Sequence, residues 1–418
     1  MYDDLIMTRD DIVKAAFKVW GRDLYRTTSL TQIALELGVS KTALYRHFKD
    51  KEALLEAMYP FFFDDCVNFI KNGYEMAARA ASVKETYLVL MRTIAEFYIR
   101  NKEAFIFSLV RVYNSRDKHN VAVEFRDRGI YFERVIHEEA GVFSHPTTMQ
   151  LVLATMVFCV AEFHRKSQNT GEAAREEDVE RVLKQIEDRV DKGLRLNAAK
   201  INALNYERIE KQTGEVKYED TEDNALLNAV AEAVAEAGPW DASMEMVARH
   251  SGLSKSGLYA HFKNRKDMLS RLFVAEFSRI ANFTKSQIET SEVSEEQLYF
   301  AIISIVNYLR SRPEILVAID WIKTRRLELA KGIPGLIYRT IGSIKLDAIK
   351  KLDHYVLVDI AQWVLFMIVN TLAWWPFAQG GDDAGANIVW AKNTKEIPNE
   401  SFRILFRFIA LGLEGLNL

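Results

Sequence analysis

The chain of 418 residues contains only two cysteines, Cys66 and Cys159. They lie 93 positions apart (159 − 66) and form no CxxC pair, which excludes a disulfide framework and a thiolate zinc site. We interpret both as inert buried thiols. The acidic start, MYDDLIMTRDD, lacks the basic-then-apolar order of a signal peptide, so we expect a cytoplasmic protein. Prolines number 7 and glycines 19, and this scarcity of helix-interrupting residues predicts long helices.

The sequence also lacks a strong net charge. Lys and Arg total 55 and Asp and Glu total 58, so the formal charge is 55 − 58 = −3. This balance excludes a wholly basic nucleic-acid coat and an acidic disordered tail, although it permits a small basic patch. The motifs GxSxG, HExxH, P-loop and helix-opening GxGxxG do not occur, and no His/Cys/Asp cluster accompanies His47 or His261. We therefore expect no enzyme activity, no cofactor and no metal site.

One long segment has no charge at all, from Ile360 to Gly381. It is about long enough to span a bilayer. Gln362 and Asn370 lie inside it, and an isolated membrane-spanning helix rarely contains such polar residues. We interpret the segment as a buried core or interface helix and expect no membrane partner.

The chain repeats itself once. SLTQIALELGVSKTALYRHFKDKEALL begins at Ser29, and SMEMVARHSGLSKSGLYAHFKNRKDML begins at Ser243. The offset is 214 throughout (243 − 29), with 11 identities over 27 gapless positions. Because the offset is just over half the chain, each copy should be a complete unit of about two hundred residues.

Each repeated segment has the pattern of a helix-turn-helix. Ser29 with Gln32 forms a capping box, Gly38 allows a sharp turn, and Ser40 caps the next helix. In that helix Leu44 and Phe48 face inward, whereas the outward positions form a small cationic tip suited to phosphates: Lys41, Thr42, Tyr45 and Arg46, followed by Lys49 and Lys51. A plain solvated helical hairpin is the alternative, and the recurrence of the outward pattern disfavours it.

The two segments LGVSKTALYRHFKDKEALL and SGLSKSGLYAHFKNRKDML both resemble the signature of the TetR family of bacterial transcriptional regulators. The resemblance implies a double-stranded DNA operator as partner, contacted in copy one by Thr28, Ser29, Lys41, Thr42, Tyr45, His47 and Lys51. In copy two the matching residues are Ser243, Lys255, Ser256, Tyr259, His261 and Arg265, with Lys263 adjoining them; Ala242 stands where copy one has Thr28. Leu24 departs from the family pattern, which usually has Gly there.

The resemblance further implies an all-α fold of two tandem TetR-like units, arranged as an intrachain pseudo-dimer. The predicted domains are a helix-turn-helix domain over 1–55, a helical ligand-binding and dimerisation domain over 56–200, a solvated linker over 201–221, a second helix-turn-helix domain over 222–269 and a second helical domain over 270–418. In the family the last two helices of each unit form a four-helix bundle with the partner's. A monomeric pseudo-dimer is expected, and a homodimer of such chains stays open.

The resemblance also implies a repressor that releases DNA when a small molecule binds, and the apolar, aromatic helical domains lead us to expect an apolar or aromatic ligand. Candidate ligand contacts are Trp321, Arg326, Trp363, Asn370 and Trp374. Aromatic residues at helical spacing are more often ordinary core, and this alternative stays open. The sequence leaves the ligand itself undetermined.

The two copies differ in charge and in the recognition helix. Residues 8–55 have nine Lys/Arg and six Asp/Glu, or +3, whereas residues 222–269 have five and seven, or −2. Arg46, which is suited to guanine edges, is replaced by Ala260. We expect copy one to contribute more DNA affinity and the half-sites to form an imperfect palindrome. The alternative function is a ligand-binding or adaptor protein in which one or both motifs have lost DNA binding.

Overall fold

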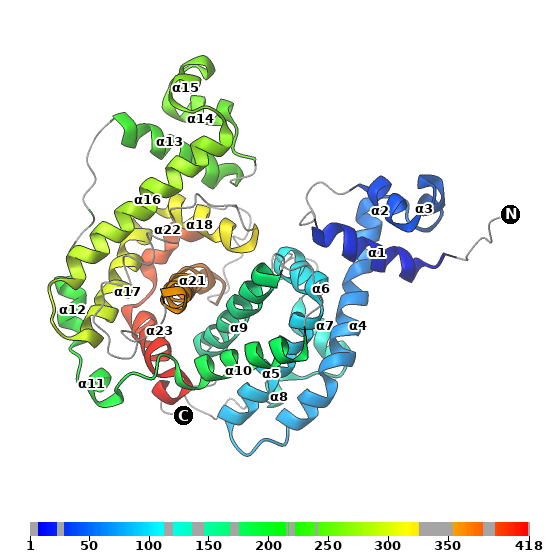
Figure 1. Cartoon of the computed structure of the whole chain (residues 1–418), viewed down its shortest axis with the longest axis horizontal. Helices are drawn as coiled ribbons and strands as arrows, with labels where there is room; N and C mark the ends of the chain where they lie inside the picture. The colour runs from blue at the N-terminus through cyan, green and yellow to red at the C-terminus, as the bar shows by residue number, and fades with distance from the viewer. Residues whose placement is uncertain are drawn as a thin grey trace. The chain divides into compact units, whose positions relative to one another are not determined.

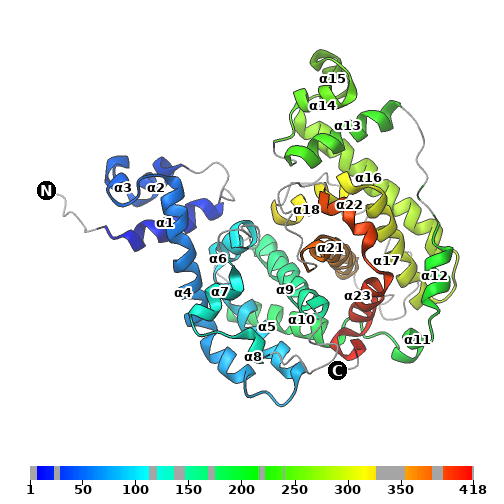
Figure 2. The same ribbon diagram turned by 180° about the vertical axis from the view of Figure 1, so that it is seen from behind.

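The computed structural model describes residues 7–22, 29–112, 120–135, 146–167, 175–214, 216, 222–238, 241–325, 354–378 and 389–416. Every regular element in these ranges is a helix, which confirms the all-α prediction (Figures 1 and 2).

The first repeat and the segment that follows it form thirteen described elements. These are α1 (Arg9–Arg22), α2 (Leu30–Leu37), α3 (Lys41–His47), α4 (Lys51–Ala77), α5 (Val83–Arg100), α6 (Lys102–Phe107), the π-helix η1 (Ser108–Val112), α7 (Val121–Asp127), α8 (Phe132–Val135), α9 (Pro146–Ser167), α10 (Glu176–Lys192), α11 (Ala198–Asn202) and α12 (Tyr206–Gln212).

The second repeat has the same order of short and long helices. Its described elements are α13 (Glu222–Ala237), α14 (Met244–Ser251), α15 (Lys255–His261), α16 (Arg265–Ile288), α17 (Ser294–Ser311), α18 (Pro313–Arg325), α21 (His354–Ala378), α22 (Val389–Asn393), the 3₁₀ helices η3 (Thr394–Glu396) and η4 (Gly412–Leu416), and α23 (Asn399–Leu411). In each repeat the three short helices lie at the start of a long one, α4 or α16 (Figure 1).

The chain divides into two compact units whose limits differ from those of the sequence repeats. The first unit comprises residues 1–144 and 159–187, and the second comprises residues 145–158 and 188–418. The second unit therefore contains part of α9 and the end of α10, which belong to the first sequence repeat. Packing between the two repeats occurs inside this unit.

In the first unit an aromatic cluster joins α1 to the helical body. The ring of Phe17 in α1 lies edge-on to Phe107 in α6, with 5.0 Å between centroids, and 5.8 Å from Phe61 in α4. Phe62, also in α4, lies 5.5 Å from the same Phe107 ring. Because Phe17, Phe62 and Phe107 are buried, hydrophobic packing holds the first helix-turn-helix domain on its body.

In the second unit the equivalent joint is a buried charged cluster. At the 214-residue offset, Phe62 is replaced by Glu276 of α16 (276 − 62), which is fully buried. Its carboxylate pairs with Arg312, just after α17, and accepts a hydrogen bond from Tyr308, with an oxygen–oxygen distance of 2.5 Å. Arg312 in turn donates to Asn228 of α13 at 2.6 Å. Polar contacts thus replace rings at the same position of the repeated fold.

Helices from the two repeats contact each other within the second unit, as an intrachain pseudo-dimer requires. The indole N–H of Trp363 in α21 donates to Thr155 Oγ1 in α9 at 3.3 Å, and the rings of Phe158 and Phe366 lie 5.6 Å apart. Arg189 of α10 pairs with Asp359 of α21. All four helices of the predicted bundle are present: α9, α10, α21 and α23.

Two described helices are long and apolar enough to cross a membrane by length and composition. They cover Thr147–Ser167 and Val356–Ala373. Of the apolar 18-residue stretch in each helix, 72% is buried in the first and 50% in the second. The second helix belongs to the charge-free segment. Its residues Trp363, Val364, Met367 and Ile368 are fully buried, as expected for the predicted core or interface helix.

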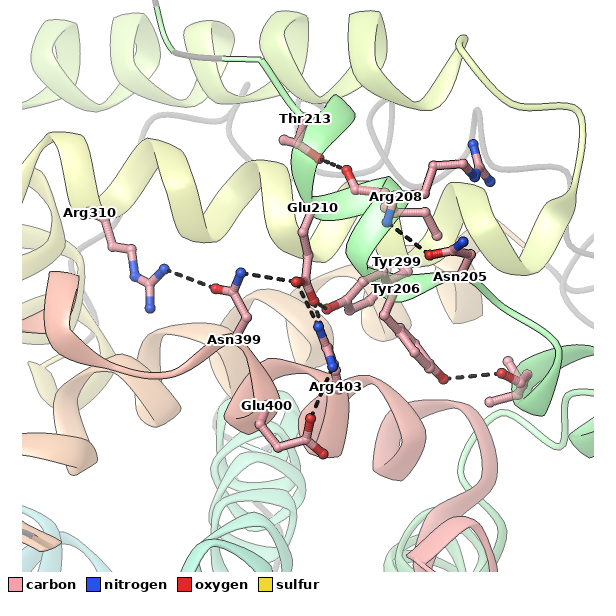
Figure 3. A network of polar contacts seen from close by, with 12 residues as sticks. Asn205, Tyr206, Arg208, Glu210, Thr213, Tyr299, Arg310, Asn399, Glu400 and Arg403 are labelled. Carbon is pink, nitrogen blue, oxygen red and sulfur yellow. Dashed lines mark hydrogen bonds and ion pairs between the residues drawn. The ribbon is translucent and has the colours of Figure 1, made fainter.

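The segment predicted to be a solvated linker is packed where it is described. Glu210 of α12 accepts two hydrogen bonds from the Arg403 guanidinium of α23, at 2.8 and 2.9 Å (Figure 3). Tyr299 of α17 donates to the same carboxylate at 2.6 Å, and Asn399 donates at 3.1 Å. Ile209 beside it is buried. The charged composition suggested solvation, since the partners of Glu210 lie 89 and 193 positions away in the sequence.

Candidate nucleic-acid interface

Local capping builds the first helix-turn-helix as the sequence predicted. Ser29 Oγ accepts from the Gln32 amide, and Gln32 Oε1 accepts from the Ser29 amide at 2.7 Å, which completes the capping box. Gly38 ends α2 with φ +69°, a left-handed conformation that glycine adopts without strain. Ser40 then caps α3 by accepting from the Ala43 amide at 3.2 Å. The turn and the recognition helix α3 are therefore specified locally.

The second motif repeats this geometry. Ser243 accepts from the Met246 amide at 3.2 Å, and Ser254 accepts from the Gly257 amide at 3.0 Å. Gly252 has φ +71°. Leu258 and Phe262 are buried, as Leu44 and Phe48 are in copy one, so α15 presents the same face outward as α3.

The predicted DNA-contacting side chains lie on the outward faces of the two motifs. Tyr45 is 46% exposed and Tyr259 is 51% exposed, which is high for such large hydrophobic residues. The other exposed members are Ser29, Lys41, Thr42, Arg46, Lys49, Lys255, Ser256, Lys263 and Arg265, whereas His47, Lys51, Ser243 and His261 are partly buried. Thr28 lies outside the described residues. The DNA-binding role of each of these residues stays a prediction.

The two recognition helices differ in how their first lysine is held. In copy one Lys41 Nζ lies 5.6 Å from the centroid of the Tyr45 ring. In copy two Lys255 forms an ion pair with Glu245 of α14, which raises the pKa of the lysine and lowers that of the glutamate. Glu245 could not be identified from the sequence pattern, because the pair connects two helices at a separation of ten residues.

Two arginines that no sequence pattern indicated support the C-terminal ends of the recognition helices. In copy one, Arg9 of α1 donates to the His47 carbonyl at 3.2 Å and lies over the Phe48 ring, 4.4 Å from its centroid. In copy two, Arg271 of α16 donates to the His261 carbonyl at 2.5 Å and lies over Phe262. A cation at this end is favourable to the helix dipole and adds positive charge beside the outward face.

Lys51 is less exposed to an approaching DNA phosphate than the sequence suggested. It begins α4 and is partly buried. Burial lowers its pKa, and the nearby Arg111 guanidinium lowers it further, although Glu52 opposes this. The matching Arg265 of copy two is exposed.

The candidate ligand residues are only partly described. Trp363 is fully buried, and its indole nitrogen already donates to Thr155 while the Arg189 guanidinium lies 5.2 Å from its ring. Asn370 is partly buried in α21. Arg326 and the side chains of Trp321 and Trp374 lie outside the described residues. In the described part of the chain, no group of three or more His, Cys, Asp or Glu side chains is arranged to hold a metal ion.

Comparison with known families identifies the same two segments. The family described as "Bacterial regulatory proteins, tetR family" matches residues 12–58 and again residues 226–272. Both limits differ by 214 (226 − 12 and 272 − 58), which is the offset of the internal repeat. Each match spans one helix-turn-helix and the start of the long helix that follows it.

Curated relatives are also helix-turn-helix regulators. The chain is 34% identical over 64 residues to the uncharacterized HTH-type transcriptional regulator YerO of Bacillus subtilis (strain 168), a match that covers 15% of this chain and 22% of that protein. It is 25% identical over 167 residues to the HTH-type transcriptional regulator SAB2452 of Staphylococcus aureus (strain bovine RF122 / ET3-1), covering 40% of this chain and 88% of the relative.

Among solved structures, the chain is similar to the fatty acid degradation regulator FadR from Bacillus halodurans. The identity is 16%, and the match covers 46% of this chain and 97% of that one, with a TM-score of 0.33. A likeness this weak does not transfer the ligand of that protein.

Proposed function

Because this chain belongs to the TetR family of bacterial transcriptional regulators and contains that family's DNA-binding domain twice, we propose that one chain reads both halves of its operator. The observation that carries the proposal is the pair of capped recognition helices, each with an exposed tyrosine and lysine on its outward face. In a two-fold regulator, two such helices enter successive major grooves. The half-sites are then unequal, because Arg46 has Ala260 as its counterpart.

We propose that the protein is a cytoplasmic repressor released by a small apolar ligand, and that it has no catalytic activity. The ligand acts by population shift: it favours an arrangement of the two recognition helices that no longer fits the DNA. The contacts between the repeats, such as those of Trp363 with Thr155 and of Arg189 with Asp359, support a monomer that needs no second chain to form the bundle.

The DNA-binding proposal is tested with the full chain and a mixed-sequence duplex in a gel-shift titration. We expect binding that weakens steeply as salt rises from roughly 50 to 200 mM, since phosphate contacts release counterions. Tyr45→Ala should weaken binding more than Tyr259→Ala, because copy one has the more positive domain. A larger loss of affinity from Tyr259→Ala contradicts the proposal that copy one contributes more of the DNA affinity.

An adaptor that has lost DNA binding is the second candidate, and the Glu245–Lys255 pair favours it for copy two alone. Absence of any duplex binding at low salt establishes this candidate for the whole chain. Light scattering completes the test. A mass near 48.0 kDa supports the pseudo-dimer, whereas twice that mass means that the assembly has four helix-turn-helix domains.

The effector proposal needs its own measurement. Anilinonaphthalene sulfonate, an apolar aromatic probe, should fluoresce with the native chain and should lower its affinity for the duplex. Probe binding that leaves DNA affinity unchanged contradicts coupling between the ligand-binding domain and the helix-turn-helix domains. A ligand that binds the DNA-binding and DNA-releasing conformations equally well does not shift the equilibrium between them.

A further inference from the structure

One carboxylate in the second helix-turn-helix engages two of the residues predicted to contact DNA. Glu245 is at the start of α14, and its side chain is 61% exposed beside Lys255, which is 51% exposed. The Lys255 side chain donates to the carboxylate and is the largest cause of its lowered pKa. The side chain of Ser243, the N-cap of α14, is a further hydrogen-bonding partner that lowers the same pKa.

Copy one has no acidic residue at this place. The 214-residue offset aligns Glu245 with Thr31 (245 − 214), Ser243 with Ser29 and Lys255 with Lys41. Ser29 is bonded to the neutral Gln32 instead, and Lys41 lies near the Tyr45 ring. The carboxylate is therefore present in copy two alone, beside a serine and a lysine that the two copies share.

Fold stability does not account for this pair. Both side chains are largely exposed, and ion pairs of that kind contribute little to stability because water screens them. The ion pair instead affects the binding of a negatively charged group, such as a phosphate, to the same face. A phosphate at Lys255 must displace the carboxylate, or the carboxylate must remain close to the phosphate and repel it.

We propose that Glu245 is a specificity-determining residue that suppresses sequence-independent DNA binding by the second helix-turn-helix. The inference rests on the proposed DNA-binding function. Copy one then binds first through its more positive domain, and copy two docks from the same chain, where its high effective concentration offsets a weak intrinsic affinity. Copy two thereby depends on base contacts, such as those of Tyr259 and Ser256, more than on phosphates.

Reciprocal exchange of the aligned residues in the full chain tests the proposal. Glu245→Thr installs the copy-one residue, and Thr31→Glu installs the copy-two residue. Affinity for a mixed-sequence duplex is measured by fluorescence anisotropy across roughly 50 to 200 mM salt. We expect Glu245→Thr to bind several-fold more tightly at low salt, with a log–log salt slope steeper by about 0.9, the value for one additional phosphate neutralised by the protein. Thr31→Glu should change both quantities in the opposite direction.

A double variant tests whether the increase in affinity of Glu245→Thr depends on Lys255. In the Glu245→Thr background, Lys255→Ala should abolish the increase in affinity, because the lysine that the exchange releases from the ion pair is then absent. Thermal unfolding measured by circular dichroism should be nearly the same for all these variants, since the exchanged side chains are exposed.

The outcomes separate this inference from the function on which it rests. If wild type binds and Tyr45→Ala loses binding, but Glu245→Thr is unchanged, then Glu245 has no role and only the inference fails. If Glu245→Thr binds more weakly, the carboxylate is itself a DNA contact, for example an acceptor for a cytosine amino group, and the inference is again wrong. If neither wild type nor any variant binds duplex DNA, the proposed function fails as well.

Discussion

Glu276 and Arg312 form an ion pair inside the second unit, with 3.0 Å between the carboxylate Oε1 and the guanidinium Nη2. Their side chains are 1% and 10% exposed. Arg279, one turn along α16, pairs with the same carboxylate and donates to Asn224 of α13. Through these two arginines, which donate to Asn224 and Asn228, the buried carboxylate is linked to α13, the first helix of the second helix-turn-helix domain.

We predict that Glu276→Gln destabilises the second unit by about 3–5 kcal/mol, the cost of leaving a buried charge without its partner. Gln preserves the shape, so the loss reports on charge rather than on a cavity. Thermal unfolding of the full chain is the measurement. Lys285→Gln in the same helix is the control, since its pair with Glu289 is exposed and contributes about 0–1 kcal/mol. Equal effects of the two substitutions contradict the burial argument.

The packed linker makes a prediction about pH. Burial raises the pKa of Glu210, but hydrogen bonds from Arg403, Tyr299 and Asn399 outweigh burial, so the pKa is lowered overall. A carboxyl with a lowered folded-state pKa stabilises the fold above its unfolded pKa of about 4.3, and this contribution is lost as pH falls through the folded value. The protection of the α12 amides, measured relative to the intrinsic exchange rate at each pH, should therefore fall below about pH 4.

Glu210→Gln separates this carboxylate from general acid unfolding. The variant should show lower protection of the α12 amides already at neutral pH, and little additional loss of protection on acidification. An α12 that is equally protected in the variant contradicts this role of Glu210, and its other contacts, such as the burial of Ile209 and the ion pair of Arg208 with Glu296, then hold the segment in place.

Much of the interface was predictable because short-range capping specifies it. Ser29, Gly38 and Ser40 adopt the conformations expected from residues within four positions of each. Leu44 and Phe48 are buried as their spacing required. In these cases the sequence contains both members of each interaction side by side, so periodicity and capping rules were sufficient.

The contacts that the sequence did not reveal join different helices, at separations of 10 to 193 positions. Arg9 reaches His47 across 38 positions, and Arg271 performs the same task for His261 from a different helix. The offset of 214 aligns Arg9 with Asp223, so even the internal repeat contained no signal for it. Glu210 likewise appeared solvated because its partner Arg403 is 193 positions away.

The thiol of Cys66 should be unreactive in the native chain. Burial raises its pKa to about 12, and the neighbouring Asp65 carboxylate adds to the shift. A thiolate is therefore scarce in the folded state, and labelling by a disulfide reagent at pH 8 should require unfolding. Because the unfolded thiol ionises first, stability should decline as pH rises from about 9 toward 12.

The two cysteines make this measurement simple to calibrate. Denatured protein should release two equivalents of reagent chromophore per chain, and Cys66→Ser should release one. Cys159 is also buried, so the native chain should react slowly at both sites. Fast reaction in native wild type that disappears in Cys66→Ser contradicts the buried assignment of Cys66.

Gly193 is where the end of the first repeat meets the C-terminal helix inside the second unit. Its φ is +55°, and an added Cβ would lie 2.5 Å from the Ile409 carbonyl oxygen and 2.6 Å from the Gly412 nitrogen. Two backbone hydrogen bonds follow it: Leu194 donates to Ile409 at 2.9 Å, and Leu196 donates to Ala410 at 3.0 Å. Because the atoms nearest to the added Cβ are backbone atoms, no flexible side chain can move aside to accommodate it.

We predict that Gly193→Ala destabilises the second unit by roughly 3 kcal/mol and exposes the Leu194 and Leu196 amides to hydrogen exchange. Gly252→Ala is the matched control: φ there is +71°, but nothing lies within 4 Å of the added Cβ, so only the left-handed penalty of about 1–2 kcal/mol applies. If the two variants lose the same stability and the two amides stay protected, close backbone contact does not hold the repeats together here. The pseudo-dimer then depends on side chains such as Trp363 and Arg189 alone.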